Sequence, residues 1–296
     1  MLRDFVGYGP TPPKVEWPNG AQIAVSVVVN YEEGAEKSPL YGDDTHETSG
    51  EIPSGMPHGA RDLFLESQWE YGARVGVWRL LNVLRDCGAH ATFFACGMAL
   101  ERNPDLGPAI VAAGHDVCAH GYRWGSQWNM DRAAEKQEIS NAAIAIERYT
   151  GKRPLSWFSK GGFSAHTREL LAEEGFVYDC DSFNDDIPYY IRVNEKPWLI
   201  VPYAVDTNDG KWWINNGWND GGQFFDYLKD SFDLLYDEGR TNPKMLSVGL
   251  HSRVCGRPGR AMAVKRFLEY AMKHPRVWVA RRDDIAAWWQ EHYPPT

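Results

Sequence analysis

The stretch Val25-Ser-Val-Val-Val-Asn-Tyr-Glu-Glu-Gly34 decides the fold of this chain. Its first residues are nearly all apolar, which is typical of a strand covered on both faces of a parallel sheet. The run then stops on two adjacent acids, Glu32 and Glu33. Catalytic groups gather at the carboxyl ends of parallel strands, so these acids are the first candidates for chemistry. A pair of glutamates that only opens a solvated loop would give the same pattern.

Two later segments predict strands that also end in reactive side chains. Segment 115–120 contains the strand Asp-Val-Cys-Ala, which leads into His120. Residues 245–250 run into His251. A carboxylate beside imidazoles can take a proton from water and supply one to a departing nitrogen. Each histidine alone would more often be structural, but three such groups at three strand ends favour a catalytic site.

Strand and helix patterns alternate along the rest of the chain. Apolar residues at helical spacing predict helices over 75–87, 103–113, 132–150, 167–174, 261–274 and 285–292, and short apolar runs predict strands over 91–96, 155–158, 177–180 and 277–280. The alternation implies an α/β fold with parallel strands and right-handed crossovers, and a barrel of seven or eight strands fits the count. We expect one catalytic domain over residues 1–296, with residues 1–22 as an extended N-terminal arm.

Composition narrows the classes of function. The 296 residues are 43% hydrophobic, which allows a large core. The net charge of −9 and the lack of a basic cluster argue against a nucleic-acid partner. No stretch predicts a membrane span or an export signal, and the five scattered cysteines fit buried thiols in a reducing compartment. We therefore expect a soluble cytoplasmic protein.

Three motifs resemble those of the polysaccharide deacetylase superfamily. Asn30-Tyr-Glu-Glu-Gly34 is similar to its Thr-Phe-Asp-Asp-Gly signature, His120-Gly-Tyr-Arg-Trp124 to its His-x-x-x-His motif, and Val248-Gly-Leu-His251 to its Leu-x-His motif. Longer runs over 183–189, 251–260 and 278–286 resemble the branch that holds deacetylase-type allantoinases and cyclic-imide hydrolases. The resemblance covers nearly the whole chain. It implies a distorted (β/α) barrel of about seven strands that hydrolyses a non-peptide amide bond.

The same resemblance implies roles for the motif residues. Glu32 takes the position of the catalytic base, Glu33 that of a metal ligand, and His251 that of the general acid. If no metal is used, Glu33 and His120 would orient water or substrate.

One departure from the family pattern concerns the metal. Trp124 stands where deacetylases have the second histidine of a zinc site, so only Glu33 and His120 remain of three protein ligands. A catalytic zinc normally has three protein ligands and an open position. Either a residue such as His46 or His58 completes the site, or no metal is needed. We expect no cofactor, with zinc or another divalent metal as the alternative.

A second departure concerns the substrate. Lys160-Gly-Gly162 stands where relatives carry an arginine that could grip a ureide, which argues against allantoin itself. A less polar cyclic imide suits a pocket that we expect to be lined by Trp124, Trp128, Trp157 and Phe158. Arg253, Arg257 and Arg260 could bind an anionic product, but we expect them to lie in solvent or between subunits.

These observations predict a hydrolase that opens a cyclic amide, imide or ureide. One alternative is a metal-dependent N-deacetylase of an acetylated sugar or glycan. Another is a catalytically inactive barrel used for binding. The expected partner is a small cyclic amide or imide, and the resemblance implies a homotetramer.

Overall fold

A sheet of nine strands organises the computed structural model, which describes residues 3–214 and 217–295. The strands are β1 (Ile23–Tyr31), β2 (Ala91–Ala95), β3 (Asp116–Ala119), β4 (Ser156–Trp157), β5 (Tyr178–Asp179), β6 (Tyr189–Val193), β7 (Lys196–Ile200), β8 (Lys244–His251) and β9 (Val277–Val279). Their order is β6-β7-β5-β4-β3-β2-β1-β8, and β9 pairs with the first residues of β1. The β6–β7 pair is antiparallel, whereas the other pairs are parallel.

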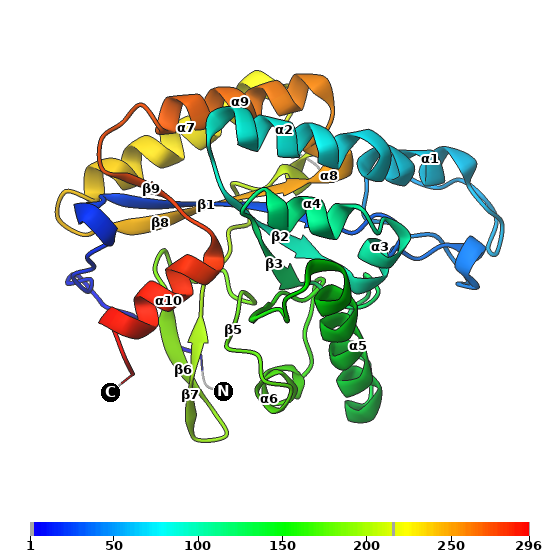
Figure 1. The fold of residues 1–296 in the computed structure, drawn as a ribbon, viewed down its shortest axis with the longest axis horizontal. Coiled ribbons are helices and arrows are strands. Elements are labelled where there is room, and N and C mark those ends of the chain that lie inside the picture. Colours follow the sequence, from blue (N-terminus) through cyan, green and yellow to red (C-terminus); the bar gives the residue numbers. More distant parts are fainter. Residues whose placement is uncertain (1–2, 215–216, 296) are drawn as a thin grey trace.

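Helices surround this sheet (Figure 1). They are α1 (Leu63–Tyr71), α2 (Val77–Cys87), α3 (Gly97–Arg102), α4 (Leu106–Ala112), α5 (Arg132–Thr150), α6 (Thr167–Glu173), α7 (Gly221–Glu238), α8 (Ser252–Cys255), α9 (Pro258–Ala271) and α10 (Arg282–His292). Shorter turns are η1 (Pro18–Gly20), η2 (Pro39–Tyr41), η3 (Gly72–Gly76) and η4 (Asp209–Trp213). Helix α9 packs between α2 and α7 on one side of β1 and β8.

The predicted distorted (β/α) barrel of about seven strands is confirmed. Seven strands, from β7 through β1 to β8, run parallel. An irregular segment crosses beside the outer edge of β8, where the Gly249 amide donates to the Thr207 carbonyl at 3.0 Å. The sequence interpretation missed α1, α3, α7, α8 and the β6–β7 hairpin.

Strand β1 is the centre of the fold because every one of its residues is buried. Its register with the neighbouring strands brings the candidate site residues to one edge. Asn30 lies opposite His251 of β8, and Tyr31 lies opposite Ala95 of β2. Ala95 in turn pairs with Ala119, the residue before His120. The strand ends that carry Glu32, His120 and His251 therefore meet, as the sequence predicts.

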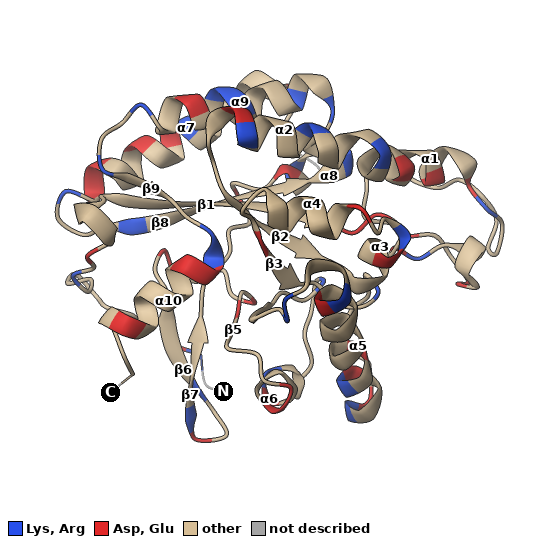
Figure 2. Ribbon diagram, viewed as in Figure 1, with Lys and Arg blue, Asp and Glu red and all other residues tan. Residues whose placement is uncertain are grey.

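Charged side chains lie mainly on the helices that surround the sheet. Figure 2 shows acidic and basic residues interspersed along α5, α7 and α9, while most of β1 and β8 carries neither. Within residues 3–214 and 217–295, none of the helices is both long and apolar enough to cross a bilayer.

A close backbone contact fixes the turn that follows β8. Gly76, at the end of η3, packs against α8, so a methyl group at Gly76 would lie 2.0 Å from the Ser252 carbonyl oxygen. Only glycine allows this approach. The contact sets the position of the turn that carries Arg253 next to the strand ends.

We expect Gly76→Ala to lower the free energy of unfolding by about 1–3 kcal/mol, because the added methyl forces two backbone segments apart. Thermal unfolding measures the change. Gly259→Ala is the matched helical control, since a methyl there meets no atom within 4 Å. Equal unfolding temperatures for the two variants would contradict the role assigned to the Gly76 contact.

Candidate active site

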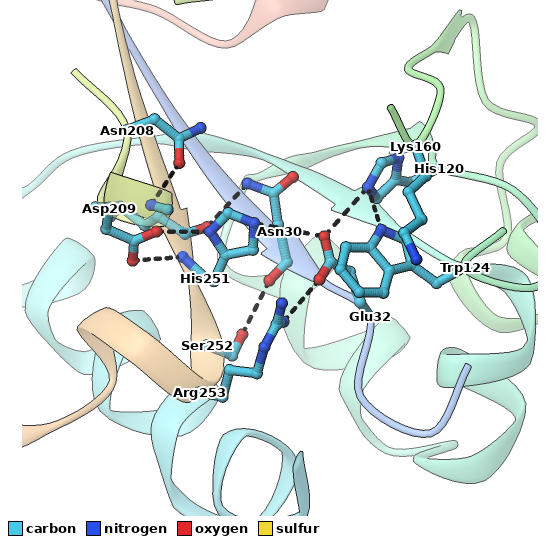
Figure 3. Close-up of polar contacts among 12 residues, drawn as sticks. Asn30, Glu32, His120, Trp124, Lys160, Asn208, Asp209, His251, Ser252 and Arg253 are labelled. Atoms are coloured by element: carbon cyan, nitrogen blue, oxygen red, sulfur yellow. Dashed lines mark hydrogen bonds and ion pairs between the residues drawn. The ribbon is translucent and has the colours of Figure 1, made fainter. Parts of the chain in front are cut away.

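The carboxylate of Glu32 forms the centre of the candidate site (Figure 3). Its Oε1 lies 3.2 Å from His120 Nε2 and 3.5 Å from His251 Nε2, and its Oε2 accepts a 2.7 Å hydrogen bond from Arg253 Nη1. The residue is 1% exposed. Burial alone would raise the pKa of Glu32, but Arg253 and the two histidines outweigh it and hold the pKa well below its ordinary value of 4.5. Glu32 is therefore an ionised carboxylate at neutral pH.

His251 is oriented by Asp209, a residue that the sequence interpretation missed. His251 Nδ1 lies 2.6 Å from Asp209 Oδ1. The other oxygen, Oδ2, accepts the backbone amides of His251 and Cys255 at 2.7 and 3.2 Å. Because a carboxylate accepts only, Nδ1 carries a proton, and Nε2 is the atom presented to Glu32. This is the arrangement of a histidine held for proton transfer.

His120 is held from both sides of its ring. Its Nδ1 donates to the carbonyl of Phe158 at 2.7 Å, because a carbonyl can only accept. Its Nε2 lies within hydrogen-bonding distance of two groups, the indole N–H of Trp124 at 3.1 Å and the carboxylate oxygen Oε1 of Glu32 at 3.2 Å. The Phe158 ring also stacks on the imidazole, with ring centroids 5.2 Å apart. Two of the expected pocket aromatics, Trp124 and Phe158, thus lie beside the site.

The position of Arg253 differs from the one that the sequence predicts. The sequence interpretation placed it in solvent or between subunits, but it is 1% exposed and paired with Glu32. Its guanidinium carbon lies 3.9 Å from the ring centroid of Trp69 and 5.1 Å from that of Trp124. The four-residue helix α8, directly after His251, turns the side chain back over β1.

Comparison with known proteins identifies the family. The polysaccharide deacetylase pattern matches residues 65–178. The structure of PuuE allantoinase is 47% identical with a TM-score of 0.95, and the match covers 100% of this chain and 99% of that one. A "probable Polysaccharide deacetylase" from Pseudomonas aeruginosa PAO1 is 46% identical, with a TM-score of 0.95 and full coverage of both chains. A "Putative polysaccharide deacetylase" of Schizosaccharomyces pombe is 36% identical over 317 residues, or 99% of this chain and 98% of that protein.

The chain belongs to the polysaccharide deacetylase family. Members of this family are hydrolases that act on C–N bonds. In this member Glu32, His120 and His251 meet at three strand ends.

The side chains at the family's metal positions do not fit a metal here. The His120 Nε2 atom, which a metal would need, already contacts the Trp124 indole N–H at 3.1 Å and Glu32 Oε1 at 3.2 Å. Both Glu33 oxygens are turned to backbone amides, those of Glu32 and Arg253. In residues 3–214 and 217–295 no group of three or more His, Cys, Asp or Glu side chains is placed to share an ion. His46 does not complete one, since its Nε2 accepts the Asp62 amide.

Glu33 instead supports its neighbours. Its Oε2 accepts the Glu32 amide at 3.1 Å and its Oε1 accepts the Arg253 amide at 3.0 Å, so it links β1 to α8. Gly72 leaves room for this carboxyl group, because a methyl there would lie 2.2 Å from Glu33 Oε1. Burial raises the pKa of Glu33 from 4.5 to about 7, even though Arg253 opposes the shift.

The raised pKa of Glu33 predicts a pH effect on stability. Between about pH 4.5 and 7 the folded protein retains a proton that the unfolded chain has released, so stability falls as the pH rises through this window. Glu33→Gln has no charge to titrate and should flatten this part of the slope. Urea midpoints of both proteins across the window measure it. Parallel curves for the two proteins would rule out Glu33 as a source of the slope.

The long segment 43–59, which the sequence marks as a binding loop or lid, is fastened at three points. Each point is an acid of the segment paired with a base, which comes from the loop after β3, the loop after β4 or helix α9. The pairs are Asp43 with Arg123, Glu47 with Lys160, and Glu51 with Arg260. Lys160 Nζ also lies 3.8 Å from the ring centroid of Trp124, so the segment is linked to the indole that bonds His120.

Two other expected pocket aromatics lie elsewhere. Trp157 is fully buried, packs on Phe176 and donates to Ser159, because alternation along the strand turns it away from Phe158. Trp128 is 67% exposed and lies beside Gly162. Trp69 and Trp213 stand near the site instead, and Trp213 packs edge-on against His251 with ring centroids 5.0 Å apart.

Proposed function

We propose that this chain is a hydrolase that opens a cyclic amide, imide or ureide by attack of water on a ring carbonyl. The observation that carries the proposal is the shared contact of Glu32 Oε1 with His120 and His251, with Asp209 behind His251. The 47% identity to PuuE allantoinase over the whole chain supports a ring substrate.

In this mechanism Glu32 is the base. It removes a proton from water as the water oxygen attacks the ring carbonyl carbon. His251, with Nδ1–H directed at Asp209, donates a proton from Nε2 to the ring nitrogen as the C–N bond breaks. The product carries a carboxyl group at the former carbonyl and an N–H at the former ring nitrogen. His120, next to the same Glu32 oxygen, orients the carboxylate and the attacking water.

Substrate entry requires movement, because the catalytic groups are covered. Glu32, His120 and His251 are all buried, with indoles from Trp124 and Trp213 packed against the two histidines. A ring can reach Glu32 only when these side chains, or segment 43–59 above Trp124, shift. Closure afterwards would exclude bulk water from the reaction.

We propose further that the reaction needs no metal. The support is the contacts of His120 Nε2 with Trp124 and Glu32 and the two backbone hydrogen bonds of Glu33, which leave the family's ligand positions committed to other partners. The alternative, a metal-dependent N-deacetylase of an acetylated sugar, would need these bonds to break. The homotetramer and the cytoplasmic location stay predictions.

The decisive experiment is ring opening by chelator-treated protein, with and without added zinc. The panel is allantoin, hydantoin, succinimide and glutarimide, with N-acetylglucosamine as the control. We expect at least one ring to open at a rate that zinc does not raise. Zinc-dependent release of acetate, without ring opening, would instead establish the deacetylase function. An inactive binding barrel would turn over none of these compounds.

A further inference from the structure

Arg253 has two buried hydrogen-bond donors without a protein partner. Nη1 donates to Glu32 Oε2 at 2.7 Å and lies 3.8 Å from Glu33 Oε1. In the part of the chain that the structure describes, Nε and Nη2 are buried and make no hydrogen bond. Buried donors almost always have partners in folded proteins, so two unpaired donors on one side chain need an explanation.

The two unpaired atoms form a functional unit. Nε and Nη2 lie along one edge of the planar guanidinium, and their N–H bonds form the fork that grips paired oxygen atoms. The pairing with Glu32 uses Nη1 and leaves this fork unfilled. In Figure 3 the end of the guanidinium lies beside Glu32, to which a dashed line joins it.

The surroundings of Arg253 hold the guanidinium but do not fill the fork. Trp69, Trp124 and Trp213 present ring centroids at 3.9, 5.1 and 5.5 Å from its central carbon, and indole rings offer no strong acceptor. The carboxylates of Glu33 and Asp209 also attract the charge of Arg253. However, the oxygens of Glu33 accept backbone amides, and those of Asp209 bond a backbone amide and His251. An acceptor from outside the protein is the remaining partner.

We propose that the free fork of Arg253 binds the second carbonyl oxygen of the substrate, the one that water does not attack. This inference rests on the proposed function and narrows it. The substrate must carry two carbonyl groups flanking one ring nitrogen, as in an imide or a hydantoin, and a simple lactam lacks the second oxygen. A hydrogen-bonded second carbonyl also spreads the negative charge that gathers on the ring nitrogen as the C–N bond breaks.

Lys160, in the loop after β4, does not supply the positive charge beside Glu32, because its Nζ is paired with Glu47. The guanidinium next to Glu32 comes from α8 instead. A lysine at residue 253 could keep a positive charge beside Glu32, but it has no fork, and this difference provides the test.

The experiment measures binding without turnover. Glu32→Gln protein and the double variant Glu32→Gln/Arg253→Lys are titrated with two matched pairs of rings, succinimide against 2-pyrrolidinone and hydantoin against 2-imidazolidinone. We expect the single variant to bind the dicarbonyl member of at least one pair about 10-fold or more tightly. The double variant should lose this preference while its affinity for the one-carbonyl ring stays the same.

Arg257→Lys in the Glu32→Gln background is the matched control. Arg257 stacks on Tyr71, outside the site, so this change should leave the preference intact. An unchanged preference in the Arg253→Lys double variant would overturn the inference. If wild-type protein opens an imide ring at the same time, the proposed function survives and only the role of Arg253 fails.

A second measurement covers the case in which the lysine variant does not fold. The four rings are tested as competitive inhibitors of wild-type turnover. We expect the dicarbonyl ring to compete about 10-fold or more strongly than its one-carbonyl partner. Equal inhibition by both members of each pair would overturn the inference without any variant.

Discussion

Replacing Glu32 by glutamine should lower kcat for ring opening by about 10²–10⁴-fold, the usual contribution of a general base. Glutamine keeps the shape of the side chain but cannot take a proton from water. The pKa of Glu32 is held low by Arg253 and the histidines, so wild-type activity should persist below pH 4.5 until another group limits it. Initial rates across pH for both proteins measure the loss.

The same change also affects stability. Removing one charge of a buried ion pair leaves the other charge uncompensated, which costs about 3–5 kcal/mol. Glutamine retains one oxygen for Arg253 Nη1, so we expect the low end of this range in urea unfolding. Glu135→Gln is the control, because Glu135 is fully buried in helix α5 and accepts hydrogen bonds from Ser164 and Thr167. Turnover within a few-fold of wild type in Glu32→Gln protein would move the role of base to another group.

The strand ends could be predicted from the sequence because local patterns determine them. Strand β8 is mostly apolar, and helix α5 begins after Asp131 and is capped by Gly151, which has a φ of 74°. Such signals lie within a few residues of the element itself. The parallel register then brings Glu32, His120 and His251 together without further information from the sequence.

The missed elements had weaker or overlooked signals. The β6–β7 hairpin turns at Asn194 and Glu195, which both have positive φ, but the pair lacks the glycine that usually marks such a turn. Helix α7 does carry a pattern, since Phe224, Leu228 and Phe232 repeat every four residues and are buried. Its signal was present and includes the Asp220 N-cap, and only the two glycines after that cap obscure the start.

The missed site residues depend on contacts between distant parts of the chain. Arg253 meets Glu32 across 221 positions, and Asp209 meets His251 across 42. A lone arginine on a loop is usually solvated, and neither residue repeats with any period. One signal was available for Arg253. It lies two residues beyond the histidine of a strand end, in a turn too short to carry it away from the site.

Asp209→Asn should lower kcat by up to about 10⁴-fold, because it changes which nitrogen of His251 carries the proton. Asparagine has one acceptor and one donor end. Its oxygen is expected to keep accepting the backbone amides of His251 and Cys255. The opposite orientation would place the NH₂ group against these N–H donors, where no hydrogen bond can form. The NH₂ group then faces Nδ1, which must become the acceptor, and the doubly protonated acid form of His251 loses its support.

A purely structural role for Asp209 predicts a different result. Substrates with different leaving groups distinguish this role from a role in proton transfer. A general acid matters less when the departing nitrogen needs little help from a proton. The rate loss in Asp209→Asn protein should therefore shrink for N-hydroxysuccinimide relative to succinimide. An equal loss for both rings would mean that Asp209 only shapes η4 and the turn after β8. Because the asparagine oxygen still serves the backbone amides, thermal unfolding should change little, and the lost turnover then reports on proton transfer by His251.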